Sequence, residues 1–135
     1  MEQKNKDLLI RDLCARLPYG VKAVLKRTNC HNSSKHKVNE KDIYSFRTGK
    51  PLEEDYGQHD YYKVVVTDIK PYLFPLSSMT DEQYKVYHEL IGGMFGTSVL
   101  INFEVLTDFF HANHFDYRGL IKKGLAIDAT GLNIY

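Results

Sequence analysis

The stretch that decides the fold lies near the end of the sequence, where residues 101–127 read INFEVLTDFFHANHFDYRGLIKKGLAI. Its first half repeats apolar side chains at helical spacing, from Phe103 to Phe110, and therefore predicts a helix. Asn102 and Thr107 are both suitable residues to cap the start of this helix. The second half begins with a tight corner, which turns the chain back on itself.

The corner at 114–119 places aromatic, charged and glycine residues next to one another. Asp116 is a typical capping residue and predicts a final short helix that runs through Lys123. Gly124 follows at the place where a helix commonly ends in a left-handed residue, with Leu125 able to contact the preceding turn. The corner therefore predicts how the domain is closed.

Tyr117 and Arg118 in this corner allow two interpretations. As structural residues, they would be held by local pairing, with Arg118 bound to Asp116 or to a carboxylate of the sheet. As functional residues, a Tyr beside an Arg would anchor a partner at an interface. The structural interpretation is favoured, and both residues are kept as candidates for partner binding.

The upstream part of the chain predicts one helix followed by a small sheet. Apolar residues on one stripe of 5–17 indicate a helix, which Pro18 ends because proline disfavours a helical conformation at the residue before it. Short alternating or β-branched runs at 21–27, 43–47 and 61–69 indicate strands. The polar segments between these runs indicate loops.

The middle of the chain links this sheet to a helical half. Pro71 and Pro75 predict an extended connector between them. Thr80 and Gln83 form a capping box, which predicts the start of a helix. The fold class is therefore α+β: an N-terminal helix, a small antiparallel sheet or partly open β-barrel of about three to five strands, and a helical C-terminal half.

Size and composition favour one globular domain, 1–135. Apolar residues make up 43% of the chain and charged residues 26%, and the net charge of +1 gives no general field for nucleic acids or membranes. No apolar run approaches the roughly 20 residues of a membrane span, and the N-terminus shows no cleavage signature. The two cysteines, Cys14 and Cys30, cannot build a disulfide framework. We therefore expect a cytoplasmic protein.

Charge is unevenly distributed along the chain. The segment 21–50 contains eight Lys or Arg and two acids, a local net charge of +6 in a chain whose total is +1. With Tyr44 and Phe46 nearby, it could bind an anionic nucleotide or a nucleic-acid backbone. It could also be a solvated edge that keeps a short sheet from pairing with other chains, and this second interpretation is favoured.

Motifs for catalysis or metal binding are weak. The glycines at 92–96 follow a helix and lack the Lys-Ser/Thr of a phosphate loop. The group Cys30, His31 and His36 and the pair His111 and His114 each fall short of the four ligands of a structural zinc site. We therefore expect no cofactor and no metal. The acidic run 53–60 lies in a polar loop, which does not hold carboxylates at the perturbed pKa that acid–base work needs.

Three blocks of sequence also carry a resemblance: KDLLIRDLCARLPYGV at 6–21, KPYLFPLSSMT at 70–80 and HFDYRGLIKKGLAI at 114–127. Together they resemble a group of small uncharacterised proteins of gut bacteria and of their phages and mobile elements. The resemblance implies an accessory protein from a phage-like context. It supplies no catalytic residues, so none are carried over to this chain.

The leading hypothesis is a non-enzymatic binding protein, an accessory protein of a phage or mobile element that modulates a host or defence component by binding it. The 10 tyrosines of the chain suit an interface. The polar loops 28–41 and 50–62 are the expected contact sites for a protein partner, with a homo-oligomer also considered. The candidate binding residues are Lys26, Arg27, Lys35, Lys37, Tyr44, Arg47, Tyr56, Tyr61, Tyr117 and Arg118.

Two alternatives remain open. The first is the binding of an anionic signal nucleotide or a nucleic acid through the basic segment 21–50. The second and weaker alternative is a small hydrolase-type enzyme with His59, His114 or Asp116 in a cleft. That enzyme would require these side chains to converge in space.

Overall fold

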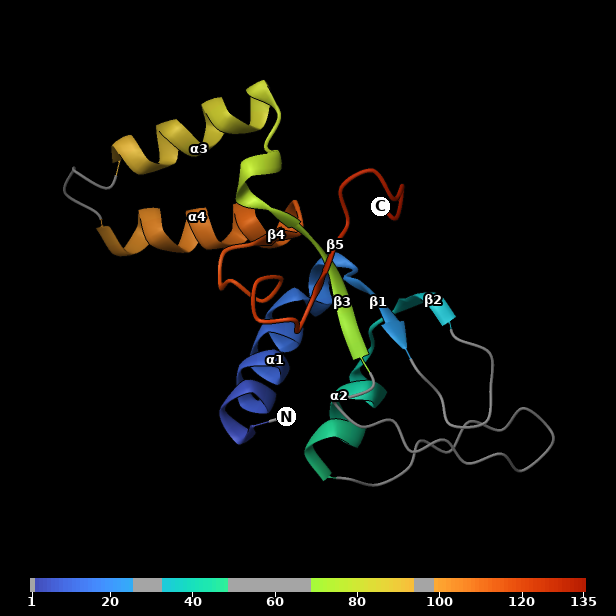
Figure 1. Ribbon diagram of the computed structural model, residues 1–135. Helices are drawn as coiled ribbons and strands as arrows, with labels where there is room; N and C mark the ends of the chain where they lie inside the picture. Colours follow the sequence, from blue (N-terminus) through green and yellow to red (C-terminus); the bar gives the residue numbers. More distant parts are fainter. Residues whose placement is uncertain (1, 26–32, 49–68, 94–98) are drawn as a thin grey trace.

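The computed structural model describes residues 2–25, 33–48, 69–93 and 99–135, and it confirms the α+β fold class (Figure 1). Its α-helices are α1 (Gln3–Arg16), α2 (Glu40–Thr48), α3 (Asp81–Gly93) and α4 (Val99–Ala112). Its strands are β1 (Lys22–Leu25), β2 (Ser33–Lys37), β3 (Ile69–Pro75), β4 (Phe115–Asp116) and β5 (Ile127–Asp128). Two short 3-10 turns, Leu17–Tyr19 and Leu76–Ser78, follow α1 and β3.

The sheet is organised around β3. Strand order is β2-β1-β3-β4, and β5 also pairs with β3. The β1–β2 and β1–β3 pairs are antiparallel, whereas β4 and β5 run parallel to β3. Of the two predicted arrangements, the open sheet is present and the barrel is not, and the two C-terminal strands make the sheet mixed.

Proline does not prevent β3 from forming a strand. The segment that was predicted as an extended connector is extended, but it lies at the centre of the sheet. Pro71 stands opposite Ala23 of β1. Farther along, Phe74 donates its backbone N–H to the His114 carbonyl at 2.8 Å, and the Leu73 carbonyl accepts from Ala129 at 2.8 Å. Proline lacks only its own donor, so the other residues of β3 still bond to neighbours on both sides.

The prediction of a strand at 43–47 was wrong, because these residues belong to α2. A capping box starts this helix: the Asn39 side chain accepts the Asp42 N–H at 3.1 Å, and Asp42 accepts the Asn39 N–H at 3.0 Å. This reciprocal pairing satisfies two amides that a helix start leaves free. The predicted polar loop 28–41 is also corrected in part, because Ser33–Lys37 forms β2 and α2 begins at Glu40. Of the predicted strand 61–69, only Ile69 lies within the described residues.

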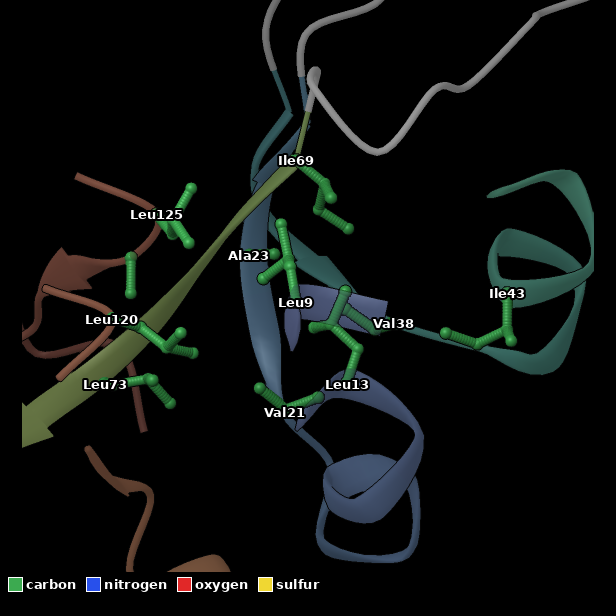
Figure 2. Packing of buried hydrophobic residues seen from close by; sticks show 11 residues of the cluster. Leu9, Leu13, Val21, Ala23, Val38, Ile43, Ile69, Leu73, Leu120 and Leu125 are labelled. Atoms are coloured by element: carbon green, nitrogen blue, oxygen red, sulfur yellow. The ribbon is translucent and has the colours of Figure 1, made fainter. Parts of the chain in front are cut away.

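The main hydrophobic core lies between α1 and the sheet. Leu9 and Leu13 of α1, both fully buried, pack against Val21, Ala23, Ile69 and Leu73 (Figure 2). Val38 and Ile43 close one side, and Leu120 and Leu125 from the C-terminal segment close another. The apolar stripe predicted for 5–17 is confirmed. The core therefore joins residues from both ends of the chain.

The helix predicted from Asp116 to Lys123 does not form. Pairing with β3 makes 115–116 extended, and Gly119 adopts a left-handed φ of +73°. Asp116 nevertheless organises the turn, since its two carboxylate oxygens accept the backbone N–H groups of Leu120 and Ile121 at 2.9 Å each. What remains of the predicted helix is a single helical turn.

The end of this turn forms as predicted. Gly124 has a φ of +74°, and Leu125 donates its N–H to the Leu120 carbonyl at 2.9 Å. Gly124 itself donates to the Ile121 carbonyl at 3.0 Å. These two bonds make a Schellman motif, in which a left-handed residue closes a helical turn.

Helices α3 and α4 form a hairpin that projects away from the sheet (Figure 1). The predicted capping box at its start is confirmed: Thr80 N–H donates to Gln83 Oε1 at 2.9 Å and Gln83 N–H donates to Thr80 Oγ1 at 3.2 Å. Tyr87 and Leu90 of α3 pack with Leu106 and Phe110 of α4. The inner face of the hairpin is therefore filled by its own side chains.

We predict opposite effects on stability for two glycine substitutions. Gly124→Ala forces an L side chain into a left-handed conformation and should lower the free energy of unfolding by about 1–2 kcal/mol. Gly92→Ala, in the last turn of α3, has open space around its Cβ and no positive φ, so it should be neutral or stabilise by up to about 1 kcal/mol. Urea denaturation followed by circular dichroism measures both. Equal effects of the two changes would contradict the role of Gly124.

Candidate functional site

The candidate binding residues do not form one cluster among the described residues. Lys35 belongs to β2 and Lys37 ends it, whereas Tyr44 and Arg47 lie on α2. Tyr117 and Arg118 lie in the corner after β4. Four candidates fall outside the described residues: Lys26, Arg27, Tyr56 and Tyr61. The same holds for Cys30, His31 and His59, for residues 28–32 of the loop 28–41 and for the whole of 50–62.

A buried ion cluster holds the corner against α1. Asp12 and Arg16 are both fully buried, and Arg16 Nε donates to Asp12 Oδ2 at 2.7 Å. Arg118 Nε donates to the other carboxylate oxygen, Asp12 Oδ1, at 3.1 Å. Arg16 Nη2 also donates to the Phe115 carbonyl at 2.6 Å. One carboxylate thus lies between two guanidinium groups, and the second guanidinium comes from the far end of the sequence.

Tyr117 packs into the same cluster. Its ring lies 5.6 Å from the Arg16 guanidinium carbon and 5.0 Å from that of Arg118, distances at which a cation is attracted to the face of an aromatic ring. It stacks on Phe110 of α4 with ring centroids 5.2 Å apart, and its hydroxyl lies 2.7 Å from His111 Nε2. Both corner residues therefore have structural contacts, and the partner of Arg118 is Asp12 instead of Asp116.

The histidines of the described chain are engaged by other residues. His36 Nε2 lies 2.6 Å from Asp42, and His111 lies beside Tyr117. His114 stacks on Tyr135 with ring centroids 3.5 Å apart. Within the described residues, no group of three His, Cys, Asp or Glu side chains is placed to hold a metal ion.

His114 occupies an unusual position in the corner. It has a positive φ of 60°, and its Nδ1 is buried without a hydrogen-bond partner in the described part of the chain. Burial lowers the pKa of His114 to about 4, and the positive charges of Arg16 and Lys22 add to this effect. Burial likewise raises the pKa of Tyr135 to about 12. The stacked pair is therefore neutral at physiological pH.

An open cleft lies between α1 and α2, which contact each other side by side (Figure 1). Its volume is about 410 Å³. The helices contribute polar, apolar and charged side chains, and Arg47 is the one predicted candidate among the described residues that line it. The lining residues are Gln3, Asp7, Ile10, Arg11, Cys14, Phe46 and Arg47.

The α3–α4 hairpin carries a second unusual surface. Phe103 is 58% exposed and Tyr84 is 53% exposed, and Val86 and Val105 are also exposed. We call these four residues the hairpin surface; on each helix its two members are two positions apart and therefore point to different sides of that helix. The sequence analysis did not predict this surface, because it counted Phe103 among the apolar residues on the packed face of its helix. The helical pattern of 99–112 contains more apolar residues than one buried face can hold, and this excess was the available signal.

We predict that the buried ion cluster is essential for stability. Asp12→Asn removes the negative charge and leaves Arg16 buried without compensation, so the free energy of unfolding should fall by about 3–5 kcal/mol. The control is Asp7→Asn, an exposed carboxylate on the same helix that accepts a 2.9 Å hydrogen bond from Gln3; this change should alter stability by less than about 0.5 kcal/mol. Chemical denaturation of both variants tests the prediction, which fails if their losses are equal.

We also predict a pH dependence that originates at His114. Because its folded-state pKa, about 4, lies below the ordinary value of 6.5, the unfolded chain takes up the proton more readily. The stabilising contribution is complete above pH 6.5 and is lost as the pH falls toward 4. Between pH 7.5 and 5 the chain should lose about 1–2 kcal/mol from this source.

The matched variant for this prediction is His114→Asn, since asparagine tolerates a positive φ and does not titrate. It should be less stable than the parent at pH 7.5 because the ring stack is lost. The difference between the two proteins should shrink by pH 5, as measured by denaturation at each pH. A difference that stays constant over this range would refute the assignment to His114.

Comparison with known proteins supplies no relative for this chain: no protein-family model, no curated protein and no solved structure matches it. The resemblance of the three sequence blocks therefore stays a prediction. None of the helices in the described ranges is long and apolar enough to cross a membrane.

Proposed function

We propose that this chain is a non-enzymatic binding protein that holds a protein partner on its α3–α4 hairpin. The observation that carries the proposal is the exposure of the hairpin surface, Tyr84, Val86, Phe103 and Val105, on one projecting element. Single exposed apolar residues are common on proteins. Tyr84 and Phe103, however, are large rings on one hairpin whose inner face is already packed, and a docking surface accounts for their exposure.

The residue types of the hairpin surface fit this role. Tyr84 and Phe103 are aromatic and more than half exposed, so a partner would remove a large apolar area from water. Tyr84 also contacts the rings of Tyr87 and His88, at 6.3 Å and 5.2 Å between centroids. A ring supported by its neighbours loses little conformational freedom on binding, which is typical of interface anchors.

Charge indicates the kind of partner. The segment 81–112 contains five carboxylates, Asp81, Glu82, Glu89, Glu104 and Asp108, and its only Lys or Arg is Lys85. A hairpin that combines exposed apolar side chains with a net negative charge complements an apolar segment flanked by Lys and Arg. We therefore infer that the partner presents a basic amphipathic helix.

The phage-like context that the sequence resemblance implies would make this partner a host or defence component, which the protein modulates by occupying its surface. The proposal moves the contact site from the predicted loops to the hairpin. It is preferred to an enzyme built on the corner because the Asp116 carboxylate already accepts two backbone N–H groups. An acid–base role would require that carboxylate to leave them.

The proposal predicts that a model basic amphipathic peptide of Leu and Lys binds the protein, and that a Leu and Glu peptide of the same length does not. Tyr84→Ala with Phe103→Ala should weaken binding at least tenfold, which corresponds to about 1.4 kcal/mol. Fluorescence anisotropy of the labelled peptide measures both.

Tyr44→Ala is the matched control, because Tyr44 on α2 is also 53% exposed. It should leave peptide affinity unchanged. Equal binding of the acidic peptide, or equal loss in the Tyr44 variant, would refute docking on the hairpin. If sedimentation instead shows a dimer that the Tyr84 and Phe103 changes dissociate, the occupant is a second copy and the basic partner is rejected.

A further inference from the structure

We infer that the cleft between α1 and α2 is a binding site for a small organic molecule with one acidic group and an apolar, ring-sized body. This site goes beyond the proposed function and lies on different helices from the hairpin surface. Its volume of about 410 Å³ falls within the range of roughly 300–1,000 Å³ that is usual for small-molecule sites.

Two arginines supply the recognition of an acidic group. Arg11 lies on α1 and Arg47 lies in the last turn of α2, and both line the cleft. Among the described residues, neither guanidinium forms an ion pair with a carboxylate. A guanidinium presents several donors in a plane that matches the oxygens of a carboxylate or phosphate. Two of them, from separate helices, can hold one such group.

The contact of Arg47 with Cys14 favours this role. Arg47 Nη2 points to Cys14 Sγ at 3.4 Å. A thiol is a weak acceptor and leaves the hydrogen-bonding capacity of the guanidinium largely unused. The interaction therefore places Arg47 at the cleft wall while its other donors stay available for a ligand oxygen.

The remaining walls define the rest of the ligand. Ile10 and Phe46 are partly buried apolar residues of the cleft, so they can contact an apolar body while the acidic group meets the arginines. Asp7 also lines the cleft and accepts a hydrogen bond from Gln3 Nε2 at 2.9 Å. Its negative charge disfavours a second acidic group on the same ligand. An aromatic acid with a single acidic group fits these walls best.

Cys14 gives a direct readout of occupancy, because it lines the cleft. Alkylation of this thiol by neutral iodoacetamide is followed by mass spectrometry of its peptide. Phenylacetate and phenyl phosphate should each slow the reaction in a saturable way, with a dissociation constant of about 1 mM. At ten times that constant the rate should fall about tenfold. The tighter of the two ligands identifies the acidic group as a carboxylate or a phosphate.

Neutral phenylacetamide, which lacks the charge, and inorganic phosphate, which lacks the apolar body, should each bind at least tenfold more weakly. Arg11→Ala with Arg47→Ala should abolish protection by both acids, whereas Lys122→Ala, an exposed cation outside the cleft, should leave it intact. Circular dichroism confirms that the double variant is folded, as expected for two exposed side chains.

The inference would be overturned by any of three results: the amide protects Cys14 as well as the acids do, the double variant is protected as well as the parent, or neither acid protects. The hairpin variants should bind these acids normally, so the two proposals fail independently.

Discussion

The interaction on which the rest of the structure depends is the burial of one carboxylate between two guanidinium groups. Asp12 and Arg16 would be an ordinary pair of neighbours on a helix surface if the chain ended at α4. The corner after β4 covers them, and Arg118 Nε donates to the second oxygen of the Asp12 carboxylate at 3.1 Å. Removing one member of the buried pair would leave an uncompensated charge and cost about 3–5 kcal/mol. The hydrogen bonds from Arg118 to Asp12 and from Arg16 to the Phe115 carbonyl couple this pair to the corner. The mixed sheet follows, because β4 and β5 flank this corner.

The two proposed sites lie on different helices, the cleft on α1 and α2 and the hairpin surface on α3 and α4. Helix α1 contributes its buried face to the core and another face to the cleft with α2. Helix α4 contacts Tyr117 through Phe110 and extends from there into the hairpin. The two sites also differ in charge, since Arg11 and Arg47 with one carboxylate, Asp7, line the cleft, whereas the segment 81–112 contains five carboxylates and one lysine. A small acid and a basic protein segment would therefore not compete for one surface.

Local signals predicted the elements whose ends are marked by capping chemistry. The Thr80–Gln83 box and the left-handed Gly124 formed as expected, because both depend on neighbouring backbone groups. The wrong prediction of a strand at 43–47 also depends on a capping box, in this case one that the sequence analysis overlooked. Five residues with alternating apolar side chains suit a strand or a helix, and the Asn39–Asp42 box that decides between them lies just before. The cleft was less predictable: Arg47 was chosen as a candidate for its charge, whereas Arg11 was not among the candidate residues.

The sequence by itself determined the α+β class, the apolar stripe of α1, the start of α3 and the closing turn, because these arise from spacing and short-range hydrogen bonds. Only the tertiary structure decided the burial of Asp12 and Arg16, the parallel pairing of β4 and β5 with β3, and the exposure of Phe103. The physical reason is that burial and pairing depend on residues about a hundred positions apart, as between Arg16 and Phe115. The closing segment was predicted to close the domain, and in the structure it supplies Leu120 and Leu125 to the core, β4 and β5 to the sheet, and Arg118 to Asp12.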